Sequence, residues 1–266
     1  MKRAFDHCAE DYARYRPPYA VGVFELLDRH ATRKLGRVAA DVGAGTGIFA
    51  RSLAAHGWSV VAIEPSLAML RQVWLGGSPP RPICDLALPR YPNSEGRIVR
   101  LRATAEQTAL ANASVALVTA AQAFHWFNPP HALAEFARIL KPGGWLALTW
   151  NNRDATKSAF VEQYEQLIVR YNPAYEREYR EQDWPAKIAE SGAFEPATRR
   201  CFDHLWRLPS ESFVGFSRSV SYIRNVLSRA QQPYFESELR ELLRRHFAET
   251  ECHIPLRTDL WTARRR

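Results

Sequence analysis

Strand-like and helix-like segments alternate over the first half of the sequence, and this alternation constrains the fold more than any other feature of the chain. Short apolar runs rich in β-branched residues occupy residues 37–41, 58–63, 97–101, 115–121 and 145–150. Between these runs, apolar residues recur at the spacing of one helix face, as Phe24, Leu27 and Ala31 do. Parallel strands are joined by helices that pack on the sheet, so the pattern predicts a mostly parallel α/β sheet covered on both faces.

The second half of the sequence has longer helical segments and two late strands. Helical patterns cover residues 158–171, 210–228 and 234–247, and strand-like runs cover residues 198–206 and 252–263. We expect the helices to form a cap and the two strands to form a hairpin at the sheet edge. The predicted regions are therefore an N-terminal lid with the first helix (1–36), a core (37–152) and a cap with terminal strands (153–266). Residues 76–96, rich in Pro, Gly and Arg, predict a surface loop.

Composition excludes several classes of protein. The chain has 266 residues, of which 46% are hydrophobic and 24% charged, which excludes a disordered or coiled-coil chain. The net charge is +8, but 31 of the 36 basic residues are Arg, a skew that coding bias alone produces. Because basic residues are scattered, apart from Arg264–Arg266, we expect a small-molecule partner rather than a nucleic acid.

Targeting signals and cysteine pairs do not stand out in the sequence. The start of the chain lacks the apolar stretch of a signal peptide, and polar residues interrupt the longest uncharged segment, residues 107–134. The cysteines lie far apart, at Cys8, Cys84, Cys201 and Cys252. This spacing favours neither disulfides nor a zinc site. We therefore expect a cytoplasmic protein with no membrane partner and no bound metal.

The strongest local motif is a glycine-rich loop that follows the first strand and opens a helix. It reads Asp41-Val-Gly-Ala-Gly-Thr-Gly47. A dinucleotide site needs the wider G-x-G-x-x-G spacing to cradle a pyrophosphate. The compressed G-x-G-x-G spacing instead suits a ligand whose amino-acid and ribose portions lie against the turn. The alternative is a tight turn that needs glycine only for its positive φ angles.

An acid follows the second predicted strand. Glu64 stands directly after Ile63, where α/β sheets place a carboxylate that binds ribose hydroxyls. The alternative is that Glu64 favours the N-terminus of the next helix, with Ser66 as its cap. Its distance from the glycine loop favours ribose binding.

With these motifs, the chain resembles the class I S-adenosylmethionine-dependent methyltransferases, in the small-molecule group that includes trans-aconitate and ubiquinone/menaquinone-pathway methyltransferases. The resemblance covers about residues 4–152. Besides the loop and residues 63–66, it rests on Phe5-Asp6, Tyr12, Tyr15, Arg16-Pro17, Tyr19, Thr104-Ala105-Glu106, residues 121–127 and residues 140–144. It implies a Rossmann-like, doubly wound, mostly parallel sheet of seven strands, with S-adenosylmethionine as cofactor.

The resemblance also implies a set of cofactor-binding residues. The methionine moiety would lie on the Asp41, Gly43, Ala44 and Gly45 turn with Gln122 nearby, the ribose on Glu64 and Pro65, and the adenine beside Ala105 and Glu106. Many relatives have Asp where Thr104 stands. Adenine contact here therefore falls to the backbone of Ala105 or to Glu106.

Candidate catalytic residues come from two segments. Methyl transfer is an in-line displacement, so positioning supplies most of the rate. His125 follows the fourth predicted strand and is a candidate base for an acceptor that must lose a proton; packing beside Trp126 is the alternative. In the N-terminal lid, Tyr12 and Tyr15 are candidates to line the methyl channel and Arg16 to pair with the cofactor carboxylate. The alternative there is a helix whose tyrosines only pack.

The cap would select the acceptor. Its predicted helices carry Phe213, Phe216, Tyr222 and Ile223 with Arg218 and Arg224. These residues suggest an apolar pocket with cationic anchors, although ordinary helix packing with solvated arginines explains them slightly better. We therefore predict a methyltransferase for a small apolar or aromatic metabolite, with oxygen favoured as acceptor atom, then carbon, then nitrogen. A nucleic-acid methyltransferase and a non-catalytic S-adenosylmethionine-binding protein are the alternatives.

Overall fold

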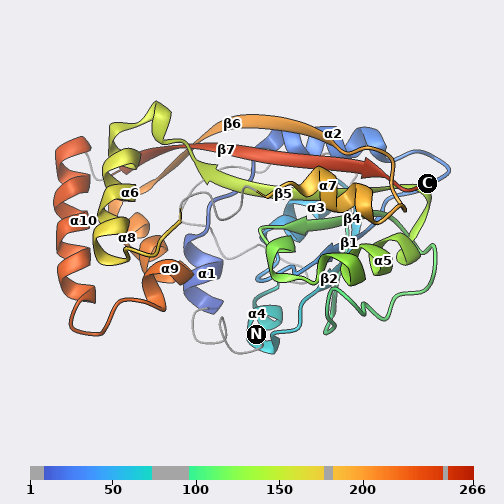
Figure 1. Cartoon of the computed structure of the whole chain (residues 1–266), viewed down its shortest axis with the longest axis horizontal. Coiled ribbons are helices and arrows are strands. Elements are labelled where there is room, and N and C mark those ends of the chain that lie inside the picture. Colours follow the sequence, from blue (N-terminus) through green and yellow to red (C-terminus); the bar gives the residue numbers. More distant parts are fainter. Residues whose placement is uncertain (1–8, 74–95, 177–181, 248–250) are drawn as a thin grey trace.

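One seven-stranded sheet runs through the molecule (Figure 1). The computed structural model describes residues 9–73, 96–176, 182–247 and 251–266, so the loop expected at 76–96 lies outside the described residues except for its last position. The strand order is β3-β2-β1-β4-β5-β7-β6. The strands are β1 (Val38–Val42), β2 (Ser59–Ile63), β3 (Ile98–Leu101), β4 (Val115–Ala121), β5 (Leu140–Arg153), β6 (Thr198–Pro209) and β7 (Glu251–Arg264).

The pairing directions confirm the expected topology. Strands β1 to β5 are mutually parallel, and β7 pairs antiparallel with both β5 and β6. The two late strands are thus added at the edge of the parallel sheet, as the sequence predicts. The α/β fold with a mostly parallel, doubly wound sheet is confirmed.

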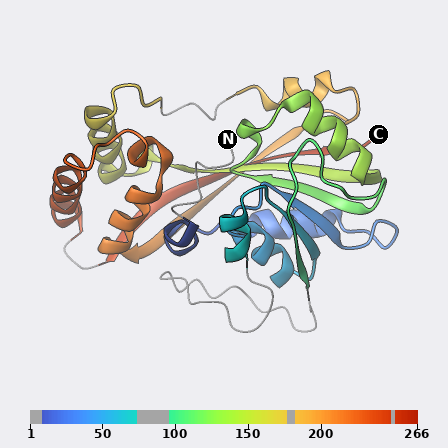
Figure 2. The same ribbon diagram turned by 90° about the horizontal axis from the view of Figure 1, so that it is seen from below.

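Helices cover both faces of the parallel part of the sheet (Figure 2). One face is covered by α2 (Val21–His30), α3 (Ile48–Ala55) and α4 (Leu67–Gln72), whose buried side chains include Phe24, Leu53 and Leu70. The other is covered by α5 (Pro129–Ile139) and α7 (Trp184–Glu190), which contribute Phe136 and Trp184 to a second core. Short 3-10 turns occupy Phe124–Trp126 and Ala155–Lys157.

Helix α7 was not expected from the sequence. Its N-cap is Asp183, whose carboxylate accepts a hydrogen bond from the Ala186 amide at 2.9 Å. The Trp184 ring stacks on Trp150 of β5 at 4.7 Å between centroids. Although α7 belongs to the region expected to be cap, it therefore packs on the core sheet.

The cap lies at one end of the sheet, around the far ends of β5, β6 and β7 (Figure 1). It consists of α6 (Ala159–Tyr171), α8 (Ser210–Ser219), α9 (Ser221–Arg224) and α10 (Gln232–His246), which share one hydrophobic cluster with those strand ends. The single helix expected at 210–228 is wrong, because the extended backbone of Val220 (φ −80°, ψ 138°) separates α8 from α9.

The first described helix, α1 (Ala9–Tyr15), lies between the parallel sheet and the cap (Figure 2). It packs against α8 at a very close approach. A Cβ atom built on Gly215 of α8 would lie 2.6 Å from the Tyr15 ring, so a larger residue there would require that ring to shift. This contact holds α1 against the cap.

Candidate functional site

A large cavity lies where the strand order reverses. Strands β2 and β4 flank β1 on opposite sides, and α/β sheets bind ligands at such a switch point, outside the carboxyl ends of the strands. The cavity has a volume of about 310 Å³. Its walls are Tyr12, Tyr19, Asp41, residues 43–46, Ile48, Phe49, residues 64–66, Met69, residues 104–106, residues 121–123, Trp126 and Phe127.

The glycine loop forms the floor of this cavity. Gly43, Gly45 and Gly47 have φ angles of +69°, +56° and +77°, which favour glycine. A Cβ on Gly43 would lie 2.6 Å from the Ala123 Cβ. The Gly43 and Ala44 amides both donate to the Ile63 carbonyl, at 2.9 and 3.0 Å. These bonds tie the loop to the end of β2, next to the acid that follows it.

Asp41 lies beneath the loop and is 1% exposed. Its Oδ1 accepts a hydrogen bond from the Thr119 hydroxyl at 2.7 Å. Among the described residues, Asp41 Oδ2 and the nearby Thr46 Oγ1 have no hydrogen-bond partner although both are buried. Burial raises the pKa of the Asp41 carboxyl to about 7, and the Thr119 bond and the nearby Ala50 amide offset this only in part. The cavity floor therefore has hydrogen-bonding capacity for a polar ligand.

Glu64 joins the loop to helix α4. Its Oε2 accepts from the Gly45 amide at 3.0 Å and its Oε1 from the Ser66 amide at 2.9 Å. The Ser66 hydroxyl in turn accepts from the Met69 amide at 3.2 Å, which caps α4. The helix-cap interpretation and a carboxylate facing the cavity are therefore both compatible with this geometry, since a carboxylate accepts about four hydrogen bonds.

The far wall of the cavity comes from the segment after β3. Thr104, Ala105 and Glu106 line it, with Pro65 opposite the same space. Glu106 Oε1 accepts a hydrogen bond from the Asn128 amide at 3.0 Å, which fixes this segment to the start of α5.

Gln122 has a strained backbone at the end of β4. Its φ of +56° is unusual for a residue with a side chain. Its Nε2 donates to the Asn151 carbonyl at 3.0 Å, while its Oε1 is buried and has no partner among the described residues. Such strain is characteristic of functional sites.

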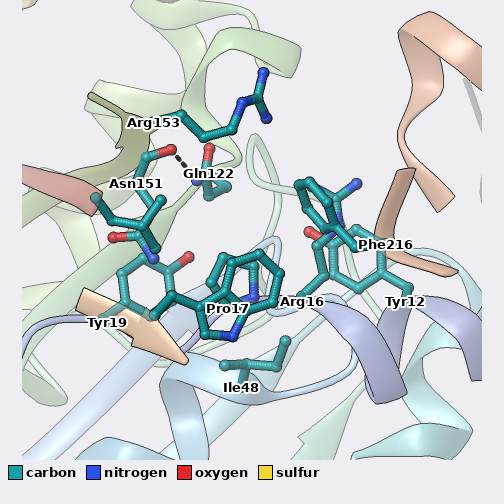
Figure 3. A pocket seen from close by; sticks show the side chains of 11 residues that line it. Tyr12, Arg16, Pro17, Tyr19, Ile48, Gln122, Asn151, Arg153 and Phe216 are labelled. Carbon is teal, nitrogen blue, oxygen red and sulfur yellow. Dashed lines mark hydrogen bonds between the residues drawn. The ribbon is translucent and has the colours of Figure 1, made fainter. Parts of the chain in front are cut away.

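A smaller cavity adjoins the large one on the cap side (Figure 3). Its volume is about 40 Å³, several times the roughly 10–15 Å³ that one water needs. Figure 3 shows its side chains around one space, with Gln122, Asn151 and Arg153 on one side and Ile48 opposite. Its lining is Tyr12, Arg16, Pro17, Tyr19, Ile48, Gln122, Asn151, Arg153, Trp206, Phe216 and Leu256.

Two arginines line the small cavity, and they differ in how many hydrogen-bond partners their guanidinium groups have. The Arg16 guanidinium lies 4.3 Å from the Tyr12 ring centroid, and its buried Nε has no partner among the described residues. Arg153 donates from Nε to Glu165 Oε1 at 2.8 Å and from Nη1 to the Tyr222 hydroxyl at 2.9 Å. Burial alone would lower the pKa of Arg153, but the adjacent Glu165 outweighs it and the pKa stands well above its usual value.

The residues predicted from the sequence to be catalytic differ in whether they line a cavity. Tyr12 lines both cavities and Arg16 the small one, whereas Tyr15 packs against Gly215. His125 is absent from the lining of both cavities; its Nδ1 receives a hydrogen bond from Trp150 Nε1 at 3.3 Å. A catalytic role for Tyr15 or His125 stays a prediction.

All ten residues predicted to bind the cofactor line one or both cavities. These are Arg16, Asp41, Gly43, Ala44, Gly45, Glu64, Pro65, Ala105, Glu106 and Gln122. Of the cap residues named from the sequence, only Phe216 lines a cavity, and the exposed Arg218 lies 3.6 Å from Glu236.

Asn151, Arg153 and Trp206 were missed by sequence reasoning. Asn151 and Arg153 directly follow a buried apolar run, at the sheet edge where α/β sites lie, so that signal was available for them. Trp206 has no such signal, because it reaches the site only through pairing of β6 with β7.

The part of the chain that the structure describes has neither a cluster suited to a metal ion nor a helix suited to span a membrane. No group of three or more His, Cys, Asp or Glu side chains there could hold a metal ion. No helix there is long and apolar enough to cross a membrane.

Comparison with known proteins shows that the chain is similar to methyltransferases. Residues 40–148 match the methyltransferase domain family. An uncharacterized methyltransferase of Mycobacterium tuberculosis is 35% identical over 170 residues, 64% of this chain and 60% of the relative. A Dictyostelium discoideum relative, also described as a methyltransferase, is 26% identical over 93% of this chain and 87% of its own length. The chain thus spans about three fifths of the mycobacterial relative.

A solved structure extends the likeness beyond that domain. A type II methyltransferase of Anaeromyxobacter dehalogenans aligns with a TM-score of 0.64 and 26% identity. The alignment covers 95% of this chain and 98% of the solved one, so the similarity includes the cap.

Proposed function

We propose that the chain is a class I S-adenosylmethionine-dependent methyltransferase and that it transfers a methyl group from S-adenosylmethionine to a small metabolite, as its similarity to methyltransferases supports. The observation that carries this proposal is the large cavity at the switch point, with the glycine loop as its floor and Glu64 beside it. When bound, the cofactor supplies an electrophilic methyl group on a sulfonium. Everything else is binding and positioning by the chain's own residues.

Glu64 is the proposed ribose ligand. Its two oxygens already accept from the Gly45 and Ser66 amides, which fixes the carboxylate in one orientation at the cavity wall. Carboxylate oxygens accept more than one hydrogen bond each, so the same group can receive two hydroxyls. Pro65, Ala105 and Glu106 extend this wall and would bind the adenosine portion.

Polar atoms on the methionine side of the cavity fit an amino acid. Asp41 Oδ2, Thr46 Oγ1 and Gln122 Oε1 are buried acceptors without partners among the described residues, and an ammonium group has three donors. Arg16 would bind the carboxylate of the same moiety, because its Nε is buried and unpartnered within the described chain. Gly43, Ala44 and Gly45 leave room for this moiety on the floor.

The acceptor would enter the space between Gln122 and the cap. Phe216, Trp206 and Leu256 give this space apolar and aromatic walls, which supports a small apolar or aromatic metabolite. Oxygen is the acceptor atom we favour, followed by carbon and then nitrogen, because two arginines beside the cavity disfavour a protonated amine. Tyr12 lines both cavities and would contact the transferring methyl.

Calorimetric titration of the full chain with S-adenosylhomocysteine tests the proposal, with NADH as control ligand. We expect micromolar binding of S-adenosylhomocysteine and none of NADH, followed by transfer of labelled methyl into a metabolite extract. Folded protein that does not bind S-adenosylhomocysteine would overturn the proposal. Binding without transfer to any extract would leave a cofactor-binding protein without catalysis.

A further inference from the structure

Trp206 brings an unused hydrogen-bond donor to the small cavity. The side chain is 1% exposed, and its buried Nε1 has no partner among the described residues. A buried N–H without a partner is energetically unfavourable, so such a group usually meets a water or a ligand. Its ring is held by Phe216 at 5.2 Å between centroids, in an edge-to-face arrangement.

The register of the hairpin places Trp206 near Arg153. Leu256 of β7 pairs with Arg153 of β5 on one side and with His204 of β6 on the other. Paired residues project from the same face of a sheet, as do residues two apart along a strand. Arg153, Leu256 and Trp206 therefore share one face, and all three line the small cavity.

Arg153 also retains a donor. Its Nε and Nη2 face Glu165, with Nη2 to Glu165 Oε1 at 2.6 Å. Its Nη1 donates only to the Tyr222 hydroxyl among the described residues, although each terminal nitrogen of a guanidinium carries two N–H groups. Arg153 and Trp206 thus offer two N–H donors from one face, next to the methionine side of the large cavity.

A proton acceptor is missing from the same lining. Within the described chain, the small cavity is lined by no His, Asp, Glu, Lys or Cys, and His125 lies outside it. An alcohol or a protonated amine must lose a proton to become a nucleophile, which calls for a base within hydrogen-bond reach. A carboxylic acid is already ionised at neutral pH.

We propose that the small cavity binds a carboxylate of the acceptor and that this protein is a carboxyl O-methyltransferase for acids with an apolar body. The inference rests on the proposed function and names its substrate class. Trp206 Nε1 and Arg153 Nη1 donate to the carboxylate, Phe216 and Leu256 contact the apolar body, and Arg16 stays with the cofactor. One carboxylate oxygen is then held while the other faces the methyl group.

The reaction needs no proton transfer. A lone pair of the carboxylate oxygen forms the new O–C bond, and the electron pair of the breaking C–S bond goes to sulfur. An anion and a sulfonium thus become a neutral ester and a neutral thioether. Charge recombination of this kind is favoured in a site that excludes water, because opposite charges attract more strongly at low dielectric.

The test measures methyl transfer to matched probes. S-adenosylmethionine carrying a labelled methyl is incubated with acids from butanoate to dodecanoate and with phenylacetate, and in parallel with the corresponding alcohols and amines. We expect label only in the acid series, as an ester that releases labelled methanol on alkaline hydrolysis. Label in alcohols or amines but not acids, or no label in any acid, would overturn the inference.

Trp206→Phe examines the donor itself, because it removes Nε1 and keeps an aromatic ring. We expect kcat/KM for the best acid to fall about tenfold or more, mainly through KM, since a hydrogen bond to a charged group is lost. Trp145→Phe is the matched control; that ring stacks on His30 at 3.7 Å, at the opposite end of β5, and its change should leave kcat/KM intact. An unchanged KM in Trp206→Phe would remove Trp206 from the acceptor site.

Binding of S-adenosylhomocysteine separates the two possible failures. If the folded protein does not bind S-adenosylhomocysteine, the proposed function itself is contradicted. If the wild type and both variants bind S-adenosylhomocysteine but no acid is methylated, only the carboxylate inference is contradicted.

Discussion

Burial makes Asp41 a pH-sensitive residue. Its carboxyl has an unfolded pKa near 3.8 and a folded pKa of about 7, so the folded state holds a proton that the unfolded state has lost between these values. This contribution to stability is fully present below about pH 3.8 and is lost as the pH rises through about 7. Ligand binding should have the opposite dependence, because a cofactor ammonium interacts favourably with the ionised carboxylate.

We therefore expect the affinity for S-adenosylhomocysteine to rise between pH 6 and pH 8, by about tenfold at most for each pH unit below the pKa of Asp41. Calorimetry in buffers of different ionisation enthalpy should detect release of a fraction of a proton near pH 7. Asp41→Asn should abolish both effects. A wild-type affinity independent of pH would show that Asp41 does not contact the ligand.

Glu64→Ala should weaken binding of S-adenosylhomocysteine by about 1–3 kcal/mol, because two charge-assisted hydrogen bonds to ribose are lost. Isothermal titration measures the change. Glu190→Ala is the control, since that acid is exposed at the end of α7. Equal affinities for wild type and Glu64→Ala would exclude the ribose role.

His125→Ala separates base catalysis from packing. A general base contributes about 100-fold or more to turnover. Because His125 lies outside the lining of both cavities and its Nδ1 is bonded to Trp150, we expect turnover to fall less than tenfold. The rate of a single turnover at saturating cofactor measures the effect. A loss near 100-fold would show that His125 acts as a general base.

At the scale of elements, α1 and α8 share the contact between Tyr15 and Gly215. A Cβ on Gly215 would lie 2.6 Å from the Tyr15 ring, so Gly215→Ala must move that ring, and we expect α1 to move with it. Tyr12 on the same helix lines both cavities. We expect the affinity for S-adenosylhomocysteine to fall several-fold, whereas Arg218→Ala, at an exposed position of α8, should not change it. An unaltered affinity in Gly215→Ala would mean that α1 does not shape the site.

The elements differ in how well the sequence predicts them. Strands β1 to β5 and the glycine loop follow from local apolar runs and turn residues, because both faces of a parallel strand are buried. Helix α7 was not predicted because only its N-cap and Pro185 mark it in the sequence. Its stability comes from Trp184, which packs on a strand far away in sequence.

The site shows the same division. The proposed cofactor side lies within segments that carry motifs, so cavity-lining residues such as Glu64 and Gln122 could be predicted from the sequence. Its acceptor side is assembled by strand register, which joins Arg153 to Trp206 across Leu256, and no local pattern encodes that register.

For the whole molecule, cofactor binding should raise thermal stability. A ligand at 100 times its Kd adds about 2.7 kcal/mol, which corresponds to about 5–10 °C in Tm for a chain of this size. Differential scanning calorimetry with S-adenosylhomocysteine should show this shift, and NADH should give none. A Tm that does not respond at saturating S-adenosylhomocysteine would contradict binding at the proposed site.

Strands β5 and β7 run without a break from the core into the cap, and β6 pairs with β7 along its whole length. Backbone hydrogen bonds therefore fix the spacing between the two ends of the molecule, and the cap cannot swing open on a hinge as a separate lobe would. The strands therefore set the width of the small cavity, while Tyr12 of α1 and Phe216 of α8 close it from the side of the helices. Any difference in acceptor size between this chain and a relative should then follow from the packing of these two helices rather than from domain motion.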